Sequence, residues 1–173
     1  VKNNLQTVAS MLRLQARSTD VDPRQALEDS VNRILAIAAV HEVLTERMED
    51  DVALAELLER LRKMIVSGLG VAKTVEARVA ELSLEGARAT PLALVFSELL
   101  QNALEHGGEG VVVELERVGE LARLVVKDDG DGIGEARYGT GLSIVEALVQ
   151  NELRGELLLD DVPGLRATVE FPL

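Results

Sequence analysis

A short stretch, Ser97–Gly107 (SELLQNALEHG), constrains the fold most strongly, because it combines an apolar helical pattern with polar residues at helical spacing. The apolar pattern predicts one buried face: Leu92, Val95, Phe96, Leu99, Leu100, Ala103 and Leu104. A second stripe is polar: Glu98, Asn102, Glu105 and His106. Glu98 and Asn102 lie one turn apart, and together they can hold a hydrated Mg²⁺, since this hard cation prefers oxygen ligands. We expect this helix to start at Thr90, as the cap, and Pro91.

Two glycine-rich segments downstream complete a pattern that is typical of a nucleotide pocket. DDGDGI (Asp128–Ile133) follows an apolar strand, and its glycines allow a sharp turn and a close approach to a flat ligand. GTGLSIV (Gly139–Val145) opens a helix whose free backbone amides form an anion site. Each segment alone is weak evidence, because a Gly-x-Gly turn before a helix is usually only a helix start. The three segments in this order are much harder to obtain by accident.

These three segments resemble the ATP-binding motifs of sensor histidine kinases, whose fold is shared with gyrase-type ATPases, Hsp90 and MutL. SELLQNALEHG resembles the N box, DDGDGI the G1 box and GTGL the G2 box. The resemblance extends over about residues 50–173 and implies Mg-ATP as the bound nucleotide. It implies ATP contacts at the following positions: Asn102, Glu105, His106, Asp128, Gly130, Gly132, Ile133, Gly139, Thr140, Gly141 and Leu142.

The resemblance also implies a role for individual residues. Asp128 would accept a hydrogen bond from the adenine amino group, which selects adenine over guanine. Asn102 would ligate Mg²⁺ together with Glu98, and Glu98 would orient or deprotonate the acceptor. The glycines Gly139 and Gly141 would meet the phosphates at the helix start.

Residues 1–49 follow the apolar spacing of a helical bundle. We expect a helix over about residues 1–17 and a longer helix from Pro23, capped by Asp22. The second helix carries one seam of regularly spaced residues: Leu27, Val31, Ile34, Ala38, His41 and Thr45. A single antiparallel hairpin leaves part of this apolar stripe exposed. The pattern therefore predicts a homodimer that forms a four-helix bundle through residues 1–49.

The start of the chain, VKNNLQ, resembles the dimerisation motif of a histidine kinase subclass related to the HWE kinases, in which His-Arg precedes these residues. The resemblance places the phosphoacceptor histidine just before Val1 and puts Asn3 one turn after it, in the catalytic centre. His41 matches the His-Glu-x-x-Thr pattern of the larger kinase class, but it lies on the second helix instead of the first. Two interpretations of His41 stay open: a seam residue that packs in the bundle or supports the site, and a phosphoacceptor.

Residues 50–173 predict a catalytic domain built as a two-layer α/β sandwich, so the whole chain is expected to be α+β. We expect a helix over Val52–Ser67, capped by Asp51. Strands are expected at 75–84, 110–118, 121–127, 155–161 and 165–171, in a mixed five-stranded sheet with three helices on one face.

Composition excludes several classes of function. The net charge of −12 and the scarcity of aromatic residues argue against binding to nucleic acid. The longest apolar run, residues 34–40, is too short to cross a bilayer, so we expect a cytoplasmic location without membrane contact. The chain has no cysteine, which rules out disulfides and thiol chemistry.

The sequence thus predicts the core of a two-component histidine kinase, which transfers the γ-phosphoryl of ATP to histidine and then to a response-regulator receiver domain. An anti-sigma-type serine kinase of the same ATP fold stays open, although such compact proteins lack the N-terminal hairpin. A non-catalytic dimeric scaffold stays open too.

Two departures from the family pattern stand out. Only Glu135–Tyr138 separate Gly134 from Gly139, where the family carries a longer lid. Leu165 follows Gly164 where the family commonly has threonine, and Thr168 is the nearest substitute.

Overall fold

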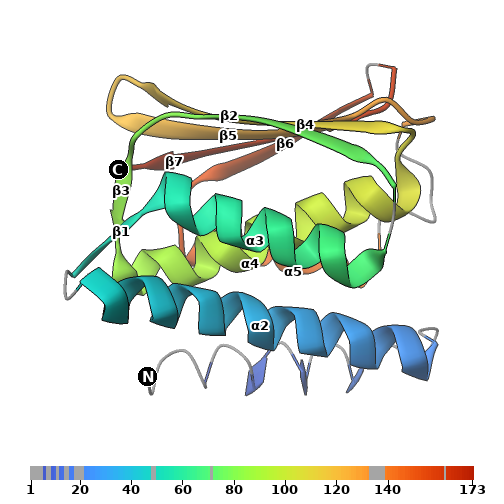
Figure 1. The fold of residues 1–173 in the computed structure, drawn as a ribbon, viewed down its shortest axis with the longest axis horizontal. Helices are drawn as coiled ribbons and strands as arrows, with labels where there is room; N and C mark the ends of the chain where they lie inside the picture. Colours follow the sequence, from blue (N-terminus) through green and yellow to red (C-terminus); the bar gives the residue numbers. More distant parts are fainter. Residues whose placement is uncertain are drawn as a thin grey trace.

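The computed structural model describes residues 6, 9–10, 12–13, 16–17, 22–47, 50–70, 72–132, 139–161 and 163–173. Its elements are α2 (Pro23–Arg47), β1 (Asp51–Ala53), α3 (Leu54–Leu69), β2 (Thr74–Val79), β3 (Ser83–Glu85), α4 (Gly86–His106), β4 (Gly110–Val118), β5 (Leu121–Asp128), α5 (Thr140–Asn151), β6 (Glu156–Asp161) and β7 (Leu165–Pro172). Figure 1 shows helices gathered on one side of a sheet, with α2 farther from the sheet than α3, α4 and α5. The predicted α+β class is confirmed.

The main sheet is mixed and has the strand order β2-β4-β5-β7-β6. Only β2 and β4 pair in parallel, and the other neighbours are antiparallel. Strand β5 lies at the centre and alternates: Ala122, Leu124, Val126 and Asp128 are buried. This period of two places Asp128 on the inner face, at the end of the central strand. The predicted five-stranded sheet is therefore confirmed.

Helix α4 forms the centre of the helical layer and packs against α2, α3, α5 and β5. Its apolar face is buried as its spacing predicts, and Phe96 is only 1% exposed. Most of the remaining core is aliphatic, with Phe171 as the other large buried aromatic. Within the described ranges, no helix has the length and the apolar character needed to cross a membrane.

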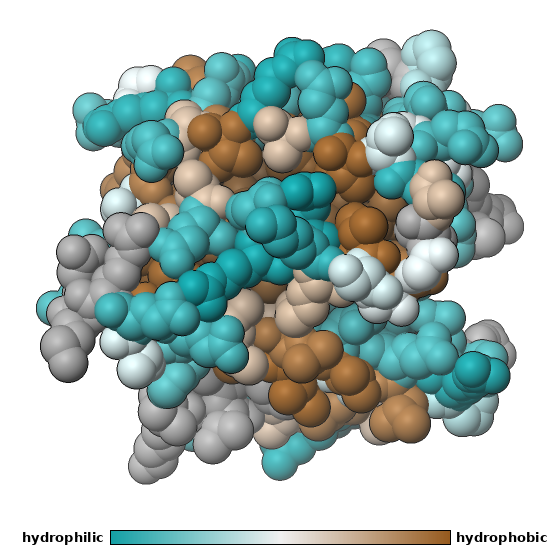
Figure 2. Space-filling model, in the orientation of Figure 1, coloured by the Kyte–Doolittle hydropathy of each residue, from teal (hydrophilic) through white to brown (hydrophobic). Residues whose placement is uncertain are grey.

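Helix α2 agrees with the sequence in its start and length, since it begins at Pro23 and spans 25 residues. The Asp22 carboxylate accepts the backbone N–H of Arg24 at 3.1 Å, as a capping residue does. One face of the helix is buried: Arg33, Ala36, Ala39, Val40 and Val43. The expected bundle seam lies on another face and is exposed, with Leu27 at 66% and Ile34 at 53%. In Figure 2 apolar side chains gather on the lower part of the surface, where α2 runs in Figure 1.

The expected start of the third helix is wrong. Asp51 does not cap it; Asp51–Ala53 form β1, which pairs antiparallel with β3, and α3 starts at Leu54. This pairing buries Val52 and Leu84 together, which a helix starting at Val52 could not do. The strand expected at 75–84 is accordingly divided into β2 and β3.

The expected entry to α4 is also wrong, because the helix begins at Gly86 and contains Pro91. Thr90 is buried in the helix instead of capping it. Tertiary contacts stabilise the added turn: the Arg88 guanidinium donates hydrogen bonds to the carbonyl oxygens of Leu153 at 3.0 Å and Pro172 at 2.7 Å. Pro91 lies in the second turn of α4, where it removes one backbone hydrogen bond.

Candidate nucleotide site

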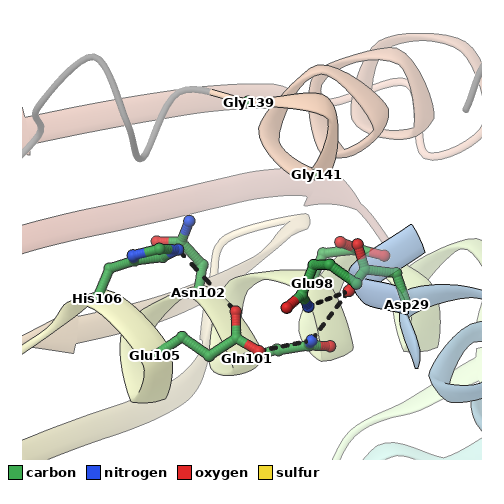
Figure 3. A pocket seen from close by; sticks show the side chains of 9 residues that line it. Asp29, Glu98, Gln101, Asn102, Glu105, His106, Gly139 and Gly141 are labelled. Carbon is green, nitrogen blue, oxygen red and sulfur yellow. Dashed lines mark hydrogen bonds and ion pairs between the residues drawn. The ribbon is translucent and has the colours of Figure 1, made fainter. Parts of the chain in front are cut away.

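A cavity of about 210 Å³ lies between α4, the start of α5 and α2. Its lining residues are Gln25, Asp29, Glu98, Gln101, Asn102, Glu105, His106, Gly139 and Gly141. Figure 3 shows the polar side chains of α4 on one side and the α5 start, with Gly139 and Gly141, across from them. Two segments that are distant in the sequence thus face one cavity.

The polar stripe of α4 behaves as its spacing predicts. Glu98, Asn102, Glu105 and His106 all line the cavity. Gly141 explains why α5 can begin so close to this stripe: a Cβ added there would lie 2.9 Å from Oε2 of Glu98. The backbone amides at the α5 start and the Glu98 carboxylate are therefore neighbours.

Glu98 is largely buried and pairs with Arg33 of α2, a residue that no sequence motif indicated. The Arg33 Nε donates a hydrogen bond to Oε1 of Glu98 at 2.5 Å, and the two side chains are only 4% and 11% exposed. Burial raises the pKa of Glu98, while the nearby Arg33 guanidinium offsets part of this rise. The carboxylates of Asp29 and Glu105 raise the same pKa further.

Three other α2 residues contribute to a polar network at the cavity. Asn32 Nδ2 donates to Oε1 of Gln101 at 3.1 Å, and Gln101 Nε2 donates to Oδ1 of Asp29 at 3.2 Å and to Oε1 of Glu105 at 2.9 Å. Gln25 Nε2 also donates to Oδ1 of Asp29, at 3.0 Å. The only sequence signal for these residues is a second stripe on α2, beside the apolar seam.

Asp128 lies behind the C-terminal end of α4 and does not line this cavity. It is 2% exposed, and its Oδ1 accepts the backbone N–H of Gly130 at 2.9 Å and of Leu165 at 3.3 Å. A Cβ added at Gly107, just after α4, would lie 2.7 Å from Cβ of Asp128. Asp128 and Asn102 are therefore near the same end of α4. Residues 133–138, which connect the two glycine segments, are outside the described ranges.

The turns around Asp128 require glycine at two positions. Gly132 has a φ of +87°, and a Cβ there would lie 2.5 Å from Oδ1 of Asp161. Gly164 has a φ of +95° and lies directly against the backbone of Asp128. At the position after Gly164, the backbone N–H of Leu165 donates a hydrogen bond to Oδ1 of Asp128. Thr168 instead lines a depression on the outer face of the sheet with Glu114 and Arg123, so it does not replace that threonine.

Two of the remaining expected site residues, His41 and Leu142, do not line the cavity. His41 is exposed on the seam face of α2, where Thr45 Oγ1 donates to its carbonyl oxygen at 2.8 Å. At 1.5 Å per residue, His41 lies about 18 Å along α2 from Asp29. Thr140 is the first residue of α5, and Leu142 is buried in the core. Asn3 and Ile133 lie outside the described residues, as does the segment Glu135–Tyr138.

The donor set at the cavity suits a hydrated cation. Glu98 and Asn102 present oxygen atoms one helical turn apart. Within the described ranges, no group of three or more His, Cys, Asp or Glu side chains is arranged to hold a metal ion. A cation here would therefore keep several waters, as Mg²⁺ does.

Comparison with known proteins gives consistent matches. Residues 1–69 match the family model described as "Histidine kinase", and residues 87–173 match "Histidine kinase-, DNA gyrase B-, and HSP90-like ATPase". Sensor histidine kinase PdtaS of Mycolicibacterium smegmatis is 40% identical over 95% of this chain and 36% of its own length. PdtaS of Mycobacterium tuberculosis is 41% identical over 93% of the chain and 35% of its own length. The chain thus spans about a third of these relatives.

Solved structures show a similar fold. The histidine kinase domain of the blue-light activated histidine kinase EL346 from Erythrobacter litoralis has a TM-score of 0.75 and 19% identity, and the match covers 100% of this chain and 95% of that one. The mycobacterial sensor histidine kinase MprB has a TM-score of 0.60 and 22% identity, over 70% of this chain and 95% of that one. At these identities the comparison supports the fold alone.

Proposed function

Because the chain belongs to the histidine kinase family, we propose that it is the kinase core of a two-component system. It binds Mg-ATP, transfers the γ-phosphoryl group to a histidine, and passes it on to an aspartate of a response-regulator receiver domain. One observation carries the proposal: the polar stripe of α4 and the glycine-flanked start of α5 line one cavity.

The adenine end is assigned to Asp128. Backbone N–H groups of Gly130 and Leu165 hold its carboxylate in a fixed orientation at the end of β5. A buried carboxylate in this position accepts a hydrogen bond from the adenine amino group, which guanine lacks at the equivalent place. Gly132 keeps the adjacent turn free of side-chain bulk, and Ile133 would contact the base.

The phosphate end is assigned to the cavity. Backbone N–H groups at Gly139, Thr140 and Gly141 bind phosphate oxygens at the α5 start. Glu98 and Asn102 would hold Mg²⁺, which neutralises phosphate charge when bound. Glu105 and His106 complete the polar wall of the cavity.

In the transfer step, the acceptor imidazole nitrogen bonds to the γ-phosphorus as the bond to the β,γ-bridging oxygen breaks and ADP leaves. Glu98 orients the imidazole or takes its proton. Most of the catalysis comes from positioning and charge neutralisation. By family resemblance the acceptor is a histidine that precedes Val1, with Asn3 one turn after it. His41 is assigned a supporting place in the dimer seam of residues 1–49.

The match of residues 1–69 to the histidine kinase model favours this function over an anti-sigma-type serine kinase, because those proteins lack such a segment. A domain boundary between residues 49 and 50 is part of the proposal.

Calorimetry with a non-hydrolysable ATP analogue, with and without Mg²⁺, tests the binding step. Asp128→Asn should weaken binding by tenfold or more, because it replaces a carboxylate oxygen at the adenine contact. Asp160→Asn serves as the matched control, since Asp160 is exposed on the outer face of the sheet. A wild-type chain that binds no nucleotide would support the scaffold alternative. Acid-labile phosphate on a chain extended upstream of Val1 tests the transfer.

A further inference from the structure

Three polar residues of helix α2 bond to the α4 wall of the nucleotide cavity, and they have no place in the proposed reaction. Asp29, Asn32 and Arg33 all bond to residues of α4. We propose that these three residues, the α2 latch, hold the cavity in a resting state, so that a Mg-nucleotide and the docked α2 compete for the same α4 residues. This inference rests on the proposed function, because it assumes that the cavity receives the phosphates.

Competition for Glu98 is the first argument. Arg33 Nε bonds to Oε1 of Glu98 at 2.5 Å, and both side chains are nearly excluded from solvent. A guanidinium and a divalent cation both bind a carboxylate through its negative charge. A bound cation therefore weakens the ion pair between Arg33 and Glu98. Removal of one partner from a buried pair is costly, because the remaining charge is left uncompensated, so Glu98 favours a bound cation when Arg33 moves away.

Charge within the cavity is the second argument. Asp29 lines the cavity with Glu98 and Glu105, so the docked helix adds a carboxylate to the region assigned to the phosphates. Like charges in a partly buried site repel. The hydrogen bonds from Gln25 and Gln101 hold the Asp29 carboxylate in this position. The docked state therefore opposes a Mg-nucleotide in two ways: Arg33 competes with the cation for Glu98, and Asp29 repels the phosphates.

The two faces of α2 connect the latch to the rest of the protein. Ala36, Val40 and Val43 continue the docked face and are at most 1% exposed. The exposed seam with Leu27 and Ile34 lies on the other face of the same helix. A shift of α2 caused by contacts on the seam would move Arg33 away from Glu98. By linkage, nucleotide binding would favour the same shift.

Arg33→Met tests the latch, because methionine keeps an apolar stem of similar length and removes the guanidinium. Its affinity for a Mg-bound ATP analogue, measured by calorimetry, should rise at least about fivefold. Arg24→Met is the matched control, because Arg24 is 85% exposed and pairs with Glu28 on the same helix; its affinity should stay within about twofold of wild type. An unchanged or lower affinity in a folded Arg33→Met chain would contradict the proposal.

A cross-link provides a second test that keeps Arg33 intact. The chain has no cysteine, so Asn32→Cys and Gln101→Cys can be joined selectively by a short bis-maleimide. The reference is the same double variant capped with N-ethylmaleimide. The cross-linked chain should bind the analogue at least about fivefold more weakly than the capped chain. Equal, measurable binding by the two would overturn the latch and leave the proposed function standing, whereas no binding by wild type or any variant would overturn both.

Discussion

Replacement of Gly164 by alanine should detach the β6–β7 turn from the end of β5. Gly164 has a φ of +95°, and a Cβ there would lie 2.0 Å from the carbonyl oxygen of Asp128 and 2.7 Å from its carbonyl carbon. These atoms belong to the backbone of the central strand, so they cannot move aside as a flexible side chain could. The turn must shift instead, and it carries the Leu165 N–H that bonds to Asp128.

Gly119 supplies the control, because it has a similar φ of +62° but no atom near its added Cβ. A left-handed backbone with a side chain costs about 1–2 kcal/mol, which both variants should lose. Overpacking adds about 1–3 kcal/mol at Gly164 alone. We therefore expect a loss in the free energy of unfolding of about 2–5 kcal/mol for Gly164→Ala and about 1–2 kcal/mol for Gly119→Ala.

Urea unfolding followed by far-ultraviolet circular dichroism is the suitable assay, because the chain has no tryptophan. Nucleotide affinity, measured in parallel, should fall for Gly164→Ala and stay unchanged for Gly119→Ala. Equal stability losses in the two variants would refute the close contact between this turn and β5, and with it our account of how Asp128 is positioned.

Two further predictions concern a charge and the core. Burial raises the pKa of Glu98, so the folded chain holds this proton more tightly than the unfolded chain, and stability should fall as pH rises above the ordinary value of 4.5. In EDTA, the urea midpoint of Glu98→Gln minus that of wild type should therefore increase as pH rises above 4.5. A difference that does not change with pH would contradict the raised pKa of Glu98. Phe96→Ala should cost about 3–5 kcal/mol in unfolding free energy, since Phe96 is 1% exposed. Leu158→Ala, at 51% exposure, should cost under about 0.5 kcal/mol, and similar losses in the two would be evidence against the assigned core.

The sequence by itself determined the features that depend on local spacing and turn chemistry. The period of α4 identified its buried face and its polar stripe, because one helix has one repeat of 3.6 residues. Asp22 and Pro23 marked the start of α2 correctly, since capping involves only neighbouring residues. The apolar run before Asp128 predicted that this carboxylate follows a strand, where the chain turns. The family motifs identified the candidate site for the same reason: each is a short segment whose chemistry is local.

Tertiary structure decided the features that depend on distant partners. Helix α3 starts at Leu54, later than predicted, because residues 51–53 pair with β3 as strand β1. Helix α4 starts earlier than predicted, and the hydrogen bonds of Arg88 to Leu153 and Pro172 stabilise this additional turn. The ion pair between Arg33 and Glu98 joins positions 65 residues apart. A spacing pattern reveals that a helix has a polar stripe, but it carries no information about which other helix that stripe meets. Only the packing of α2 on α4 brought Arg33 to Glu98.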